Sequence, residues 1–84
     1  MAIILDKYIE IKNLFSPEIV YERLQDEFID IMYPDHVSET SVIMLLDIGI
    51  DPHKEEDMLW LKGLLDTILR EIGESQYFLT PYNF

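Results

Sequence analysis

The sequence has 84 residues, 49% of them hydrophobic, and no cysteine, which indicates one folded domain over residues 1–84 and excludes disulfides and cysteine-based sites. Seventeen acidic residues stand against six basic ones, for a net charge of −11, and phosphates would therefore be repelled, which disfavours direct binding to nucleic acid or to an anionic membrane. No apolar run approaches the roughly 20 residues of a membrane span, and residues 1–5 lack the basic start of a signal peptide, so we expect a cytoplasmic protein.

The first predicted element covers residues 3–15. Helical spacing relates four of its side chains, Ile4, Tyr8, Ile11 and Phe15. This spacing predicts a helix. Residues 8–12 also alternate between apolar and polar side chains, so a short edge strand is the alternative.

A second helix should begin at Ser16 and Pro17, because serine can cap free backbone N–H groups and proline suits the first helical position. One apolar face follows, made by Val20, Leu24, Phe28 and Ile31. We expect the helix to end near Tyr33, because Pro34 disfavours helical geometry in the residue before it.

The next element is the apolar run 42–48, which is bounded by Gly49. We interpret it as a short buried helix that begins near Ser38. A buried strand is the alternative, because periodicity does not distinguish the two in so short a run.

The longest helix should run from Pro52 to Ile72, since Asp51 and Pro52 repeat the signal of a cap followed by proline. Its apolar stripe has helical spacing and consists of Met58, Leu61, Leu65, Ile68 and Ile72. Gly73 is the natural stop.

The tail, residues 75–84, holds four aromatic side chains, and Pro81 disfavours a helix through it. We expect a strand-like arm or an irregular segment lying on the helices. The elements together predict an all-α fold, a compact small bundle of three to four helices with an extended aromatic C-terminal tail. An α+β fold with a short N-terminal strand is the alternative.

Candidates for chemistry are few. His36 and His53 lie near carboxylates, a combination that can bind metal or transfer protons. However, capping explains Asp51, and the two histidines lack the four-residue spacing that would place both on one helical face. The sequence contains no nucleophile elbow around a serine and no glycine-rich phosphate loop. We therefore predict no enzymatic activity, no metal and no cofactor.

The acidic residues are concentrated in one part of the chain. Residues 18–57 hold twelve acids and only two bases, Arg23 and Lys54, for a net charge of −10. Within the second predicted helix an acid recurs every four residues, about 6 Å apart along the axis, which is near the phosphate spacing of a nucleic acid. We predict a protein-binding surface made by Glu18, Glu22, Asp26, Asp30, Glu27, Glu55, Glu56 and Asp57.

The expected function is an acidic inhibitor that binds a basic, nucleic-acid-handling protein and blocks its nucleic-acid site by charge mimicry. Immunity proteins against nuclease toxins and phage proteins of the anti-defence type share these general traits, an analogy of type that rests on no motif. The alternative is a helical adaptor or oligomerisation domain whose apolar helix faces pair with a copy of the chain or with another helical protein. Acidity would then serve only solubility.

Overall fold

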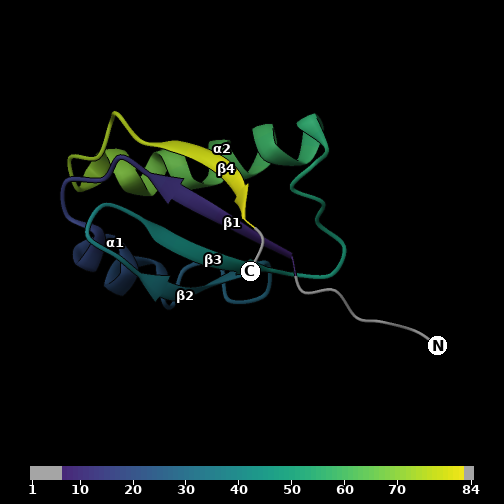
Figure 1. Ribbon diagram of the computed structural model, residues 1–84, viewed down its shortest axis with the longest axis horizontal. Coiled ribbons are helices and arrows are strands. Elements are labelled where there is room, and N and C mark those ends of the chain that lie inside the picture. The colour runs from purple at the N-terminus through teal and green to yellow at the C-terminus, as the bar shows by residue number, and fades with distance from the viewer. Residues whose placement is uncertain (1–6, 83–84) are drawn as a thin grey trace.

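The computed structural model describes residues 7–82 and shows an α+β fold with one four-stranded antiparallel sheet and two helices (Figure 1). The predicted all-α bundle is therefore wrong, and the α+β alternative is the correct class. The elements in chain order are β1 (Lys7–Lys12), α1 (Pro17–Leu24), β2 (Met32–Val37), β3 (Val42–Leu46), α2 (Glu55–Glu71) and β4 (Phe78–Tyr82). The strands lie in the order β2-β3-β1-β4, and this β-α-β-β-α-β connectivity is called ferredoxin-like.

β1 replaces most of the first predicted helix. The helix prediction is wrong from residue 7 onward, and its residues 3–6 lie outside the described part of the chain. The strand alternative is correct in type, but β1 is an inner strand that pairs with β3 on one side and β4 on the other. Ile9 and Ile11 are fully buried, with more exposed polar neighbours between them. The segment forms a strand rather than a helix because two neighbouring strands supply hydrogen-bond partners for its backbone.

α1 begins as predicted, with Pro17 at its first position, but it ends at Leu24 rather than near Tyr33. The chain leaves the helix early because the backbone from Met32 onward pairs with β3. Phe28, which was expected on the helix, packs against the core from the connection that follows it. The predicted side-chain cap by Ser16 is absent from the described structure.

β3 corrects one further prediction, and β2 pairs with it at the edge of the sheet. Residues 42–46 form a strand, so the strand alternative holds there and the short helix is wrong. β2 contains the buried Pro34, followed by an irregularity in register before His36. Proline is tolerated because β2 lies at the edge of the sheet, where some backbone N–H groups need no partner strand.

α2 confirms the longest predicted helix, although its first residue is Glu55 rather than Pro52. It has no break, and Leu61, Leu65 and Ile68 are buried. The helix ends as expected, because Gly73 adopts a φ of +84°. The N–H groups of Gly73 and Glu74 donate to carbonyl oxygens of the last turn, which is the Schellman arrangement. The tail forms β4, the extended arm that the sequence predicts, and pairs with β1.

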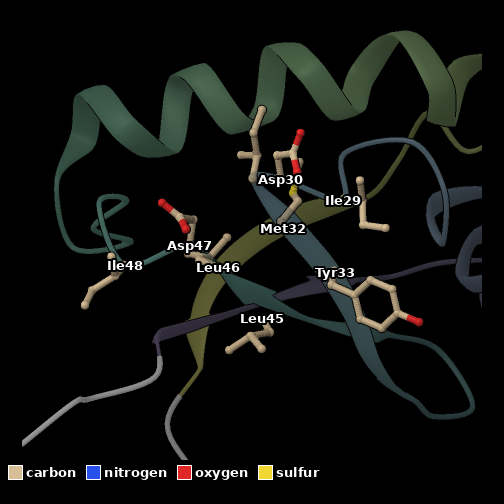
Figure 2. Close-up of a pocket in the computed structure, with 9 residues that line it drawn as sticks. Ile29, Asp30, Met32, Tyr33, Leu45, Leu46, Asp47 and Ile48 are labelled. Carbon is tan, nitrogen blue, oxygen red and sulfur yellow. The ribbon is translucent and has the colours of Figure 1, made fainter.

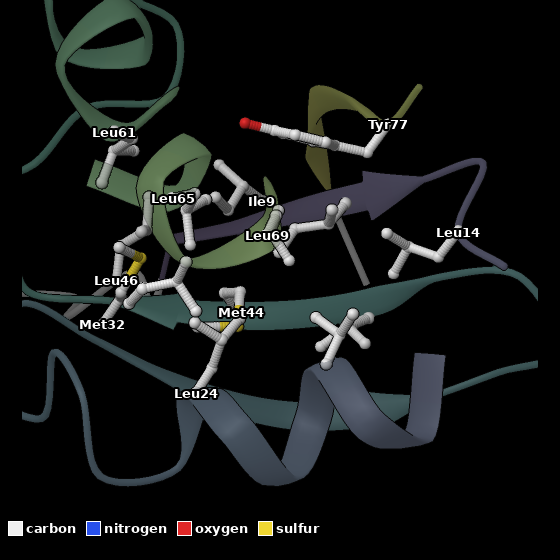
Figure 3. Packing of buried hydrophobic residues seen from close by; sticks show 14 of the residues in the cluster. Ile9, Leu14, Leu24, Met32, Met44, Leu46, Leu61, Leu65, Leu69 and Tyr77 are labelled. Atoms are coloured by element: carbon white, nitrogen blue, oxygen red, sulfur yellow. The ribbon is translucent and has the colours of Figure 1, made fainter. Parts of the chain in front are cut away.

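Both helices pack on the same face of the sheet. Alternate residues of the inner strands, including Ile9 and Met44, point to this face and join side chains of both helices in one core (Figure 3). Leu24 of α1 and Leu65 of α2 lie in this core, and Arg23 pairs with Glu71 across the two helices. The opposite face of the sheet carries neither of the two described helices.

Candidate protein-binding site

The structure divides the predicted acidic stripe. Glu18 and Glu22 are exposed on α1, whereas Asp26 and Asp30 are exposed in the turns that follow it. Because α1 ends at Leu24, the four carboxylates do not share one helical face, and their predicted regular spacing is not formed. The fifth member, Glu27, pairs with Arg23 at 2.7 Å.

Two connections that carry five acidic residues meet at one end of the sheet. Residues 25–31 lead into β2 and residues 47–54 follow β3, and the N–H of Asp47 donates to the carbonyl of Ile31 at 2.7 Å. With the first turn of α2 they form what we call the acidic end. Its carboxylates belong to Asp26, Glu27, Asp30, Asp47, Asp51, Glu55, Glu56 and Asp57, and Lys54 is the one lysine or arginine in the same stretches.

A hollow of about 250 Å³ opens at the acidic end, between the start of β2 and the end of β3 (Figure 2). Three of its lining side chains are apolar or aromatic and accessible, with exposed fractions of 63% for Ile29, 71% for Ile48 and 42% for Tyr33. Asp30 and Asp47 line it as well. Contiguous exposed apolar side chains rimmed by polar ones are typical of interaction sites.

Hydrogen bonds fix some of these carboxylates and leave others available. The carboxylate of Asp51 accepts the N–H of His53 at 2.9 Å, and this bond is the main cause of its lowered pKa. Asp57 accepts the N–H of Asp51 at 2.8 Å, so these two carboxylates hold the loop before α2. Within residues 7–82, Asp30 and Asp47 form no ion pair, and both can meet a cation from a partner.

The sequence prediction named six of the eight acids of the acidic end, but it did not include Asp47 and Asp51 and it missed the apolar part of the site. Ile29 lies off the apolar face of the helix predicted through it, and this mismatch was an available signal. Ile48 was assigned to a buried helix, and only the pairing of β2 with β3 brings it to the same hollow as Ile29.

The histidines do not assemble a further site. His36 lies 2.7 Å from Asp35, while His53 is an exposed residue in the loop before α2. Among residues 7–82, no group of three or more histidine, aspartate or glutamate side chains is placed to hold a metal ion. Neither helix in that range is long and apolar enough to cross a membrane.

Comparison of the chain with protein-family models, with curated proteins and with solved structures finds no match. The ferredoxin-like connectivity does not indicate a function, because a common fold supports many unrelated functions. The hollow and its carboxylates are therefore the features of this chain that bear on function.

Proposed function

We propose that this protein is an acidic inhibitor rather than an enzyme. It binds a basic, nucleic-acid-handling protein of the cytoplasm and covers the surface which that protein uses for nucleic acid, as nuclease-toxin immunity or phage anti-defence proteins do. The observation that supports this proposal is the hollow, where two exposed isoleucines lie beside Asp30 and Asp47, two aspartates that form no ion pair within residues 7–82.

The two parts of the hollow contribute differently to binding. Full burial of an isoleucine side chain is worth about 1.5–3 kcal/mol, so Ile29 and Ile48 are the candidates for anchoring residues. The carboxylates of the acidic end accelerate association with a basic surface and select against acidic ones. A protein surface that binds phosphates is rich in lysine and arginine, which makes it complementary to this end of the molecule.

The predicted binding residues now fall into two groups. Six of them belong to the acidic end: Asp26, Glu27, Asp30, Glu55, Glu56 and Asp57. Glu18 lies at the start of α1, beside Glu39 of the β2–β3 turn, and Glu22 lies on α1 itself. We assign partner contact to the first group.

Two charge-matched double variants test this assignment. D30N/D47N removes two charges from the hollow, and E18Q/E39Q removes two charges at the start of α1. After the partner is isolated with the wild-type protein, affinity is measured by calorimetry at several salt concentrations. D30N/D47N should weaken binding at low salt by about tenfold or more, mainly through slower association, while E18Q/E39Q should bind nearly as wild type does. Equal affinities of the two variants would refute the hollow as the site.

A second pair of variants separates anchoring from charge. Ile48→Ala should speed dissociation because it removes apolar area from the interface, and Ile19→Ala, at an exposed position of α1, should not. Inhibition is measured on the partner's own nucleic-acid binding or cleavage. A partner that stays fully active while bound would show that the protein is not an inhibitor.

The structure offers less support for the alternative function, a helical adaptor or oligomerisation domain that acts through its apolar helix faces. It requires apolar helix faces that are free to pair, but Val20 and Leu24 of α1 and Leu61 and Leu65 of α2 are buried against the sheet.

A further inference from the structure

A row of four side chains crosses the whole sheet on the face opposite the helices. Register places Tyr33 opposite Leu45, Leu45 opposite Tyr8, and Tyr8 opposite Tyr82. Directly opposed residues of paired strands point to the same face, and Figure 2 shows Tyr33 and Leu45 pointing away from α2. We call this surface the open face.

A second row continues the open face and consists of His36, Ile43, Glu10 and Thr80. Lys12 lies on the same side of β1, two residues beyond Glu10, and the two side chains are 3.7 Å apart. At the β2 edge Asp35 lies 2.7 Å from His36. Each charged side chain that the described structure places on this face therefore has a partner of opposite charge or a histidine beside it.

This pairing matters because the chain as a whole carries a charge of −11. Two copies repel each other wherever unpaired carboxylates meet, which makes the acidic end unsuitable for self-association. The open face allows two copies to approach with little such repulsion, and it offers aromatic side chains, which are favoured in protein interfaces.

The edges of the sheet disfavour the other route to self-association. β2 contains Pro34 followed by a register shift, and β4 contains Pro81. Proline has no N–H to donate to an added strand, and both proline and bulges are common protections of sheet edges. A second copy is therefore expected to approach face to face rather than edge to edge.

We propose that the open face is covered by a second copy of this chain, in a two-fold dimer whose two sheets pack face to face. In such a dimer the same surface serves both partners, and two packed sheets lie about 10 Å apart. This inference does not rest on the proposed inhibitor function, but the open face and the hollow overlap. Tyr33 and Leu45 also line the hollow, so the variants below leave both residues unchanged.

Charge reversal at two lysines provides the first test. Lys12→Glu and Lys54→Glu change the net charge equally, but only Lys12 belongs to the open face. Sedimentation across a range of concentrations should show a reversible dimer for the wild-type protein. Lys12→Glu should raise its dissociation constant about tenfold or more, and Lys54→Glu should change it much less. A wild-type protein that is monomeric at every concentration, or equal effects of the two variants, would overturn the proposal.

A second test avoids any change in charge and works even if Lys12→Glu fails to fold. The chain has no cysteine, so a single introduced thiol reports only its own position. Thr80→Cys places a thiol on the open face, and Thr67→Cys places one on the exposed side of α2. Alkylation at Thr80→Cys should slow several-fold as protein concentration rises, whereas alkylation at Thr67→Cys should not. Concentration-independent rates at both positions would overturn the dimer.

Discussion

Glu74 is 1% exposed, and its two carboxyl oxygens connect parts of the chain that are distant in sequence. They accept the N–H groups of Phe15 at 2.9 Å and of Ser16 at 2.6 Å. Phe15 and Ser16 immediately precede α1, so Glu74 fixes the chain where it enters this helix, through N–H groups other than those that the predicted Ser16 cap would serve. The same residue closes the C-terminal turn of α2 and thereby ties the two helix ends together.

Replacement of Glu74 by alanine should therefore be strongly destabilising. A buried N–H group that is left without a partner costs about 1–3 kcal/mol, and the bonds from Phe15 and Ser16 to Glu74 are partly buried, so Glu74→Ala should lower the free energy of unfolding by about 2–4 kcal/mol in urea denaturation. Glu74→Gln should lower it less, because the amide oxygen can still accept one N–H. Glu39→Ala, an exposed control in the β2–β3 turn, should stay within about 0.5 kcal/mol of wild type. Similar losses for Glu74→Ala and Glu39→Ala would contradict this role.

Tyr77 predicts how stability responds to alkali. Its hydroxyl donates to Asp66 at 2.9 Å, and Lys62 lies 4.5 Å from the centre of its ring. Burial, followed by the bond to Asp66, raises the pKa of Tyr77. The folded protein holds the Tyr77 proton more tightly than the unfolded chain does. The contribution of Tyr77 to the free energy of unfolding is therefore complete below the unfolded pKa of about 10, and it is lost as pH rises above that value. Tyr77→Phe should reduce this alkaline loss in denaturation measurements, and the exposed control Tyr33→Phe should not.

The same pair predicts an opposite effect in acid. The hydrogen bond from Tyr77 is the main cause of the lowered pKa of Asp66. The ionised carboxylate of Asp66 therefore contributes to the free energy of unfolding above the unfolded pKa of about 3.9, and this contribution is lost as pH falls below that value. In Tyr77→Phe, NMR titration should therefore find the pKa of Asp66 closer to its ordinary value. An unchanged pKa would show that Arg70, which lies 2.7 Å from Asp66, is sufficient to lower it.

At the scale of elements, two glycines of the α2 region should respond in opposite ways to the same substitution. Gly63 lies inside the helix with open space where a Cβ would be, whereas Gly73 adopts a φ of +84°. Gly63→Ala should raise the free energy of unfolding by about 0.5–1 kcal/mol, and Gly73→Ala should lower it by about 1–2 kcal/mol. Thermal melting of the two variants checks both signs, and a stabilising Gly73→Ala would mean that the C-terminal turn is not formed as described.

Elements with their own start and stop signals were the predictable ones. Pro17 marks the start of α1 and Gly73 the end of α2, because these residues act through local backbone geometry. The sequence alone favoured no strand at the positions of β1, β2 and β3, whereas β4 falls in the tail that was expected as a strand-like arm or an irregular segment. Residues 8–12 satisfy both periods, and residues 42–46 are too short a run for periodicity to decide. Only pairing between distant segments resolves such runs, and the hollow, which depends on the pairing of β2 with β3, was missed for the same reason.

At the scale of the whole molecule, the charge of −11 should have two effects. It should lower the stability of the fold through repulsion between carboxylates, and it should attract a basic partner. Glu22 lies on α1, and Asp26 lies just beyond its C-terminal end, where a negative charge is unfavourable. E22Q/D26N should therefore hold or slightly raise the melting temperature, while it slows association with a basic partner at low salt. Salt titration of the association rate is the measurement. A variant that associates as fast as wild type at low salt would show that carboxylates away from the hollow do not steer binding.

The pairing of β1 with β4 has a practical consequence for any engineered form of this protein. Tyr8 is opposite Tyr82, and Lys7 is opposite Leu46, one of the residues that line the hollow. The chain thus enters β1 and leaves β4 at the end of the sheet where the hollow opens. A circular permutant that joins Tyr82 to Lys7 directly would need only a short linker across this end. A fusion partner joined directly to Lys7 or to Tyr82 would be tethered at the end of the sheet that carries Asp47 and Ile48, so it should be removed before binding is measured.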